Sequence, residues 1–262
     1  MSSQVKAFYD VFSERFIRDF VFGNLRVQRQ VEYFSQAIPA DTKRILVIGC
    51  GSGESALHLV EHVAPQANIL AVDLASNSVE IAQKLFPHPQ IQYQQMDVVT
   101  DTIDGSWDVI VMPDVLEHIP LDGRDVLFEK INTLLSDRGI LLITCPAPNA
   151  RRSRRRAENT LSQIVDEDVS LEDLMHAGKI TNCRLSFYRL ASIWHPNDYF
   201  HAMLEREPDT EAELSTSTAT PIKCCPQVSP LRIKLGRLAR RMRLHRFGEK
   251  WRERFVRKRM KQ

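Results

Sequence analysis

Glycines and acids spaced as in a nucleoside-binding site recur between residues 49 and 118. Gly49, Gly51 and Gly53 alternate with small residues in the stretch Gly-Cys-Gly-Ser-Gly, where the backbone can approach a ligand closely. Asp73 follows about 20 residues later, which is the separation at which an acid binds ribose hydroxyls in nucleotide-binding folds. The segment 114–118, Asp-Val-Leu-Glu-His, adds groups that can accept a proton.

The glycine pattern favours a cationic nucleoside over a dinucleotide. Counting from Gly49, the third glycine of the dinucleotide fingerprint falls on Glu54. Counting from Gly51, it falls on Ala56, which that fingerprint tolerates, so the spacing alone does not exclude NAD. Glu54 at a helix start suits the helix dipole, but it is a poor neighbour for a pyrophosphate. We therefore expect S-adenosylmethionine (SAM), whose sulfonium and ammonium groups are positive.

Asp73 and a further acid, Asp97, have natural roles toward such a ligand. The carboxylate of Asp73 can accept hydrogen bonds from both ribose hydroxyls. Asp97 can accept one from the exocyclic amine of adenine, while Met96 packs beside the ring. Both acids follow apolar runs, so each is expected at the end of a strand.

Alternating strand and helix patterns position these residues. Ligands of a parallel α/β sheet bind at the carboxyl ends of its strands, where Asp73, Asp97 and Asp114 all fall. We predict an α/β fold with a doubly wound, mostly parallel seven-stranded sheet and helices on both faces. The predicted strands are 45–48, 68–73, 91–96, 107–113, 139–144, 182–193 and an antiparallel 199–204, and the predicted helices include 4–37, 54–63, 77–86 and one capped by Ser170.

Four ordered segments resemble the class I SAM-dependent methyltransferases over roughly residues 40–200. The resemblance implies methyl transfer from SAM to an oxygen of a small molecule or glycan. One position departs, because the family usually has Asp or Glu where this chain has Val47. That departure leaves a second hypothesis open, a non-catalytic module that keeps the fold and docks membrane or RNA through a basic tail. An RNA methyltransferase is a further alternative. The matching segments are 47–53, 72–74, 96–97 and 114–118, and the implied cofactor-binding residues are Gly49, Gly51, Gly53, Asp73, Leu74, Met96 and Asp97.

The segment 114–118 supplies the catalytic candidates His118, Asp114 and Glu117, which can share one turn. In one interpretation Glu117 caps or pairs and His118 lines the end of the sheet. In another, a base stands beside the acceptor hydroxyl. The segment also resembles ubiquinone-pathway O-methyltransferases and small-RNA 2′-O-methyltransferases, in which such residues hold a divalent metal. Metal-free relatives carry the same five residues, so we expect no metal.

Candidates for binding the acceptor come from two stretches. Tyr9 lies in the predicted helix 4–37, and Tyr9-Asp10 resembles the lid of many small-molecule methyltransferases. The segment 194–201, Trp-His-Pro-Asn-Asp-Tyr-Phe-His, contains His195, Asp198 and His201. It is either a turn before the last strand or part of the acceptor pocket, and it resembles methyltransferases of bacterial surface-glycan clusters. The basic run 151–156 is a solvated loop or a contact for substrate phosphate.

Charge separates the end of the chain from the rest. Residues 231–262 carry a net charge of +12 and the remainder −10. Their apolar residues recur at helical spacing, which predicts a basic amphipathic helix, broken near Gly248 and too arginine-rich to fold back on the body. We expect an anionic membrane surface as its partner, with RNA less favoured and a subunit contact as the third alternative. The expected divisions are a lid at 1–42, a SAM-binding domain at 43–205, a disordered linker at 206–230 and the tail at 231–262.

Composition agrees with a cytoplasmic enzyme. The chain has no apolar run long enough to span a membrane, and residues 1–6 lack the charged start and apolar core of a signal peptide. Its five cysteines are odd in number and include no Cys-x-x-Cys, which argues against a disulfide framework or a zinc site. We expect a cytoplasmic location, peripheral at the inner face of the membrane if the tail binds lipid.

Overall fold

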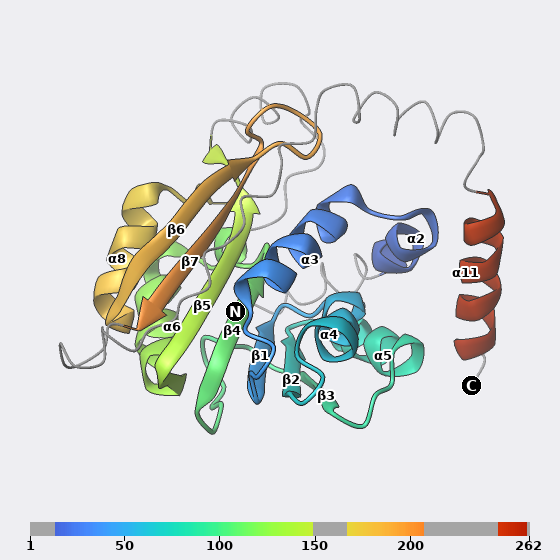
Figure 1. The fold of residues 1–262 in the computed structure, drawn as a ribbon, viewed down its shortest axis with the longest axis horizontal. Coiled ribbons are helices and arrows are strands. Elements are labelled where there is room, and N and C mark those ends of the chain that lie inside the picture. Colours follow the sequence, from blue (N-terminus) through green and yellow to red (C-terminus); the bar gives the residue numbers. More distant parts are fainter. Residues whose placement is uncertain (1–13, 149–166, 207–245, 261–262) are drawn as a thin grey trace.

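A seven-stranded sheet with helices on both faces forms the centre of the structure, a computed structural model that describes residues 14–148, 167–206 and 246–260 (Figure 1). The strand order is β3-β2-β1-β4-β5-β7-β6, and β7 runs antiparallel to its neighbours β5 and β6. The order reverses between β1 and β4, which is where open α/β sheets bind ligands. The strands are β1 (Arg44–Ile48), β2 (Asn68–Asp73), β3 (Ile91–Gln95), β4 (Trp107–Pro113), β5 (Leu135–Pro146), β6 (Cys183–Ala191) and β7 (Tyr199–Arg206).

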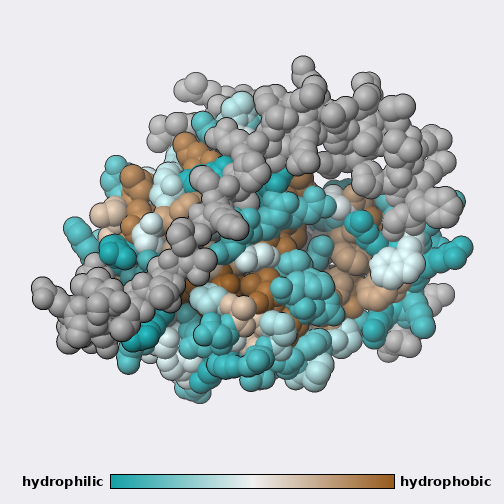
Figure 2. Space-filling view, viewed as in Figure 1, coloured by the Kyte–Doolittle hydropathy of each residue, from teal (hydrophilic) through white to brown (hydrophobic). Residues whose placement is uncertain are grey.

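The apolar runs form strands because both faces of the sheet are covered. In β1, Leu46 and Ile48 face one apolar cluster with the helices α6 (Leu121–Leu134) and α8 (Leu171–Thr181). Ile45 and Val47 face a second cluster with α3 (Leu25–Ala37), α4 (Glu54–His58), the π-helix η1 (Leu59–Val63) and α5 (Ser76–Leu85). The predicted fold class is confirmed. On the face with α3 to α5, polar side chains dominate and apolar ones show between the helices (Figure 2).

Helix boundaries follow local capping. Ser170 and Asp173 form the predicted capping box at the start of α8, with Asp173 N–H 3.2 Å from Ser170 Oγ. The predicted helix 4–37 is instead two helices, α2 (Glu14–Phe22) and α3, and residues 4–13 lie outside the described residues. Gly23 breaks it with a φ of 78°, and Asn24 then caps α3 by accepting the Arg26 N–H at 3.0 Å. None of the described helices is long and apolar enough to cross a membrane.

The C-terminal helix α11 (Arg246–Arg259) packs on the body, which corrects the expectation that the tail would not fold back (Figure 1). Val256 is buried in a cluster with α2 and α5, and the Phe255 ring lies 6.2 Å from that of Phe20. The helix also continues through Gly248 without the expected break. The charge does not oppose docking because the basic side chains lie mainly on the opposite face of the helix. Residues 231–245 lie outside the described residues.

Glu54, the first residue of α4, lies between these packed helices. Burial raises the pKa of the Glu54 carboxyl to about 7, Arg252 of α11 opposes the shift, and Asp19 of α2 adds to it. The raised pKa means that the folded protein binds the proton more tightly than the unfolded chain does. Ionisation of Glu54 therefore lowers stability as the pH rises from about 4.5, the ordinary value, through 7.

Glu54→Gln removes this ionisation and should stabilise the fold at alkaline pH. We expect the free energy of unfolding to rise by on the order of 2 kcal/mol at pH 8 and to change little near pH 4.5. Urea denaturation at both pH values measures this change, with Glu61→Gln, which alters an exposed acid of the following helix η1, as the control. A variant less stable than the wild type at pH 8 would show that the charged form of Glu54 stabilises the fold.

Candidate active site

The glycine turn after β1 has the conformation that its sequence predicts. Gly49, Gly51 and Gly53 have φ values of 79°, 52° and 86°, in the left-handed region. A Cβ at Gly49 would lie 2.2 Å from the Val115 side chain, so this turn packs directly against the end of β4. The N–H groups of Gly49 and Cys50 both donate to the Val72 carbonyl, at 2.8 and 2.9 Å, which ties the turn to the end of β2.

Asp73 joins the glycine turn to the end of β2. Its Oδ2 accepts the Gly51 N–H at 2.9 Å and its Oδ1 accepts the Ala75 N–H at 3.0 Å. The half-buried carboxylate therefore lies beside the glycine backbone, where a ribose between turn and strand would be within its reach. A carboxylate has enough acceptor sites to bind backbone and ligand together.

The end of β3 lies next along the same edge. The Met96 N–H donates to the Asp73 carbonyl at 2.9 Å, which fixes the buried Met96 beside Asp73. Asp97 is half-buried, and its Oδ1 accepts the Val99 N–H at 3.0 Å. Leu74, also half-buried, accepts a 3.3 Å bond from Gln95 through its carbonyl. The structure therefore brings the predicted cofactor-binding residues to one edge of the sheet.

Asp114 has a partner that the sequence does not indicate. It follows β4 with a φ of 55°, a conformation that Asp tolerates better than most residues. Its buried carboxylate forms an ion pair with Arg26 of α3. The other carboxylate oxygen accepts the Thr144 hydroxyl at 3.3 Å, and that hydroxyl in turn accepts Gln30 Nε2 at 2.9 Å. Asp114 therefore connects α3 to the ends of β4 and β5.

Glu117 and His118 lie on the short 3-10 helix η2 (Leu116–His118), and Glu117 faces the sheet. Its Oε2 lies 3.1 Å from Cys145 Sγ, and its Oε1 lies 3.8 Å from His118 Nε2. Burial and the neighbouring Glu117 raise the pKa of the Cys145 thiol well above its ordinary value, so the thiol remains a hydrogen-bond donor. The His118 side chain is 16% exposed, against 2% for Glu117. Glu117 thus lies within ion-pair distance of the imidazole, should the ring be protonated.

The segment 194–201 divides between two roles. Asp198 is fully buried and accepts the N–H groups of Ile193, Trp194 and His195 at 2.7, 3.0 and 3.1 Å, so its carboxylate holds the turn before β7. His201 lies on β7, paired in register with Thr144 of β5. The loop residue His195 contributes its backbone to the turn.

His201 is a buried neutral imidazole. Its ring stacks on that of Tyr33 at 4.7 Å, and its Nε2 has no hydrogen-bond partner among the described residues. Burial, together with the positive charges of Arg189 and Arg29, lowers the pKa of His201 to about 4. At neutral pH the ring therefore accepts hydrogen bonds and carries no charge.

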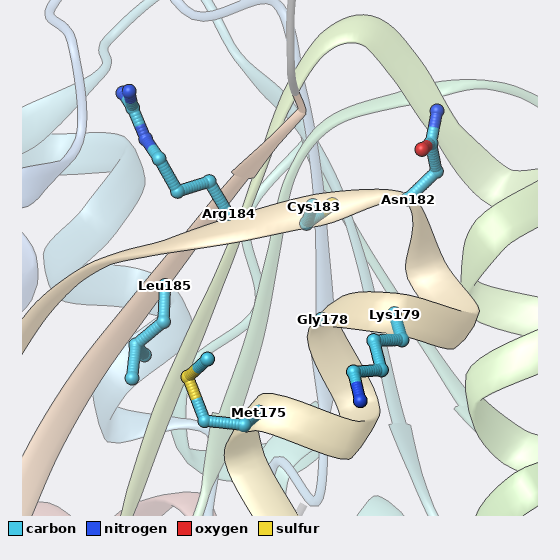
Figure 3. Close-up of a pocket in the computed structure, with 7 residues that line it drawn as sticks. All are labelled: Met175, Gly178, Lys179, Asn182, Cys183, Arg184 and Leu185. Carbon is cyan, nitrogen blue, oxygen red and sulfur yellow. The ribbon is translucent and has the colours of Figure 1, made fainter.

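Three other expectations concern a bound metal ion, the lid residue Tyr9 and the basic loop 151–156. Within 14–148, 167–206 and 246–260, no three His, Cys, Asp or Glu side chains are grouped so that they could hold a metal ion. Tyr9 and the basic run 151–156 lie outside the described residues. A cavity of about 330 Å³ lies between α8 and the start of β6 (Figure 3). By strand register, it lies at the opposite end of the strands from the glycine turn. Met175 and Leu185 are among its lining residues.

Comparison with known proteins identifies the family. The model of a methyltransferase domain matches residues 18–193. An uncharacterized protein of Rickettsia prowazekii is 31% identical over 124 residues, which is 45% of this chain and 49% of that protein. A ubiquinone biosynthesis O-methyltransferase of Nitrosococcus oceani is 33% identical over 95 residues, 35% of this chain and 39% of that enzyme. The chain thus spans about half or less of the length of these curated relatives.

Solved structures agree on the fold. The magnesium protoporphyrin IX methyltransferase of Synechocystis, solved with S-adenosylhomocysteine (SAH), superposes with a TM-score of 0.61 at 15% identity and covers 78% of this chain and 99% of that one. The chain therefore belongs to the class I SAM-dependent methyltransferases. The family and the cofactor expected from the sequence are confirmed.

Asp73→Ala should weaken binding of SAH. The variant lacks the charged carboxylate that would accept hydrogen bonds from the two ribose hydroxyls, so the affinity for SAH should fall about 10- to 100-fold. Isothermal titration measures it, with Asp108→Ala as the matched control. Asp108 also accepts two backbone N–H groups, those of Lys43 and Arg44 at 2.9 Å, but at the opposite end of the strands. Equal SAH affinity in Asp73→Ala and the wild type would contradict the ribose assignment.

Proposed function

We propose that this protein transfers the methyl group of SAM to an oxygen atom of a small-molecule acceptor, with a glycan as the less favoured acceptor. The supporting observation is that Asp73, Asp97 and Asp114 meet at one edge of the sheet, beside the glycine turn. Relatives named as ubiquinone biosynthesis and malonyl-[acyl-carrier protein] O-methyltransferases support oxygen as the acceptor atom. A phosphoethanolamine N-methyltransferase of Plasmodium falciparum, 26% identical over 142 residues, points to nitrogen instead.

His118 is the group that we assign to proton removal. When bound, SAM would supply a methyl group on a positively charged sulfur. The acceptor oxygen would bond to the methyl carbon, the sulfur would leave as the thioether of SAH, and the acceptor hydroxyl would lose its proton. His118 has the solvent access to receive that proton, and buried Glu117 stabilises the imidazolium that forms. Both carboxylate oxygens of Asp114 already bind Arg26 and Thr144, which makes it the weaker candidate.

His201 is the group that we assign to acceptor binding. Thr144, His201 and Arg189 occupy register positions side by side on β5, β7 and β6. Tyr33 and Gln30 of α3 cover this row. A buried imidazole without a partner costs free energy, which a hydrogen bond from an acceptor hydroxyl would recover. The first residue of this row, Thr144, contacts Asp114 at the end of β4. An acceptor bound along the row would therefore lie beside the proposed cofactor position.

Methyl-labelled SAM and a fractionated small-molecule extract test the reaction. We expect a labelled product whose mass rises by one methyl group, formed with release of SAH. His118→Ala should reduce its rate about 100-fold or more while leaving SAH affinity within twofold, because base catalysis contributes about 10²–10⁴-fold. His176→Ala, which removes an exposed histidine paired with Asp125, is the control. Binding of SAH without any labelled product from small-molecule or glycan fractions would favour the non-catalytic alternative.

We also propose that α11 binds anionic membrane surfaces. Its exposed face carries Lys250, Arg254, Arg257 and Lys258, and Trp251 at the edge of that face is 64% exposed. Each basic residue near an anionic lipid surface contributes about 1 kcal/mol, and an interfacial Trp adds apolar contact. Because Phe255 and Val256 pack on the body, attachment would rest on charge and Trp251 and not on insertion of the whole apolar face.

Co-sedimentation with phosphatidylcholine vesicles, with and without phosphatidylserine, tests the attachment. We expect binding only to the phosphatidylserine vesicles, and less of it at high salt. Arg254→Glu/Arg257→Glu should abolish it, while the control Lys179→Glu/Arg184→Glu, on exposed positions of α8 and β6, should not. Retention of vesicle binding in the first variant would remove α11 from the interaction. A shift of RNA in a gel without vesicle binding would assign the basic face to nucleic acid.

A further inference from the structure

The order of the strands indicates where the methionine end of the cofactor lies. The proposed adenine and ribose positions fall at the ends of β3 and β2, and the next strands along this edge are β1 and β4. Neighbouring strands lie about 4.8 Å apart, so three spacings carry a ligand about 14 Å, from β3 to β4. An extended SAM molecule that follows this edge therefore has its α-amino-acid group near the ends of β1 and β4.

Among the described residues, the end of β1 itself carries no charged side chain at that position. Val47 is fully buried in the apolar cluster beneath α3, and Gly49 packs against Val115. The charges come instead from Asp114, adjacent in sequence to Val115, and from its partner Arg26. The side chains of Asp114 and Arg26 are 5% and 22% exposed, so both charges are largely shielded from water.

The position of Arg26 is unfavourable unless it meets negative charge. It is the second residue of α3, and the first turn of that helix contains no acid. A cation there opposes the helix dipole, whose positive end lies at the N-terminus. The negative charge of Asp114 offsets part of this repulsion between Arg26 and the helix N-terminus. A ligand carboxylate beside Arg26 would be attracted by both the guanidinium and the helix end.

We propose that Arg26 and Asp114 together bind the α-amino-acid end of SAM, with the guanidinium on its carboxylate and the Asp114 carboxylate on its ammonium group. The bound group and the pair each have zero net charge, so binding buries no uncompensated charge. The arrangement also explains how the chain can hold the cofactor with valine at position 47. The inference rests on the cofactor of the proposed function and is independent of the acceptor.

Three ligands separate the two charges. SAH carries both groups, its decarboxylated analogue carries only the ammonium, and 5′-methylthioadenosine carries neither. By isothermal titration, Asp114→Asn should weaken SAH and the decarboxylated analogue about tenfold or more and leave 5′-methylthioadenosine within threefold. Asn keeps the tolerance of a positive φ and a side-chain acceptor for Thr144, so it removes mainly the charge. Arg26→Gln should weaken SAH alone.

Arg184→Gln, which removes an exposed arginine from its pair with Glu205, should leave all three affinities unchanged. Equal losses for SAH and 5′-methylthioadenosine in both variants would show that the pair only holds α3 in place, and would overturn the proposal. Unchanged SAH affinity in both would also overturn it. If a variant fails to fold, Asp114→Glu or Arg26→Lys replaces it, and a changed ratio of SAH to 5′-methylthioadenosine affinity remains the expected result. Wild-type protein that binds none of the ligands would instead refute the proposed function.

Discussion

The hydrogen bond from the Gly51 N–H to the Asp73 carboxylate connects the two halves of the proposed cofactor site. It joins the glycine turn after β1 to the end of β2, which also accepts Gly49 and Cys50 through the Val72 carbonyl. The left-handed φ values of the glycines make this turn possible, and the buried parallel strands bring the two ends side by side. The proposed positions of the adenine, the ribose and the amino-acid group all follow from the order of the strand ends along this edge of the sheet, β3-β2-β1-β4.

The helix α3 plays the matching role on the side that we propose for the acceptor. Its Arg26, Gln30 and Tyr33 reach Asp114, Thr144 and the carbonyl of Ala202 in turn, so one face of a single helix contacts β4, β5 and β7. Tyr33 also stacks on His201, whose neutral ring depends on that burial. A displacement of α3 would therefore alter the cofactor end and the acceptor row together.

The sheet and the cofactor edge were predictable because their signals are local. Apolar runs and glycines determine where strands and the turn occur, and parallel order places Asp73 and Asp97 together. The partner of Asp114 was not predictable, because Arg26 reaches it only through tertiary packing of α3. Likewise, an amphipathic pattern does not say what covers its apolar face, so the docking of α11 was missed. For Asp198 the sequence left a turn and a pocket contact both open, because Asp in a polar turn suits either role, and its three bonds to backbone N–H groups show the turn.

A crystal structure of the protein with SAH tests the central claim most directly. The account predicts that the ribose hydroxyls bind the Asp73 carboxylate and that the adenine lies beside Met96 and Asp97. The thioether would then extend along the glycine turn toward the end of β4. SAH bound at another edge of the sheet, or a site in which Asp73 makes no contact with the ribose, would contradict it.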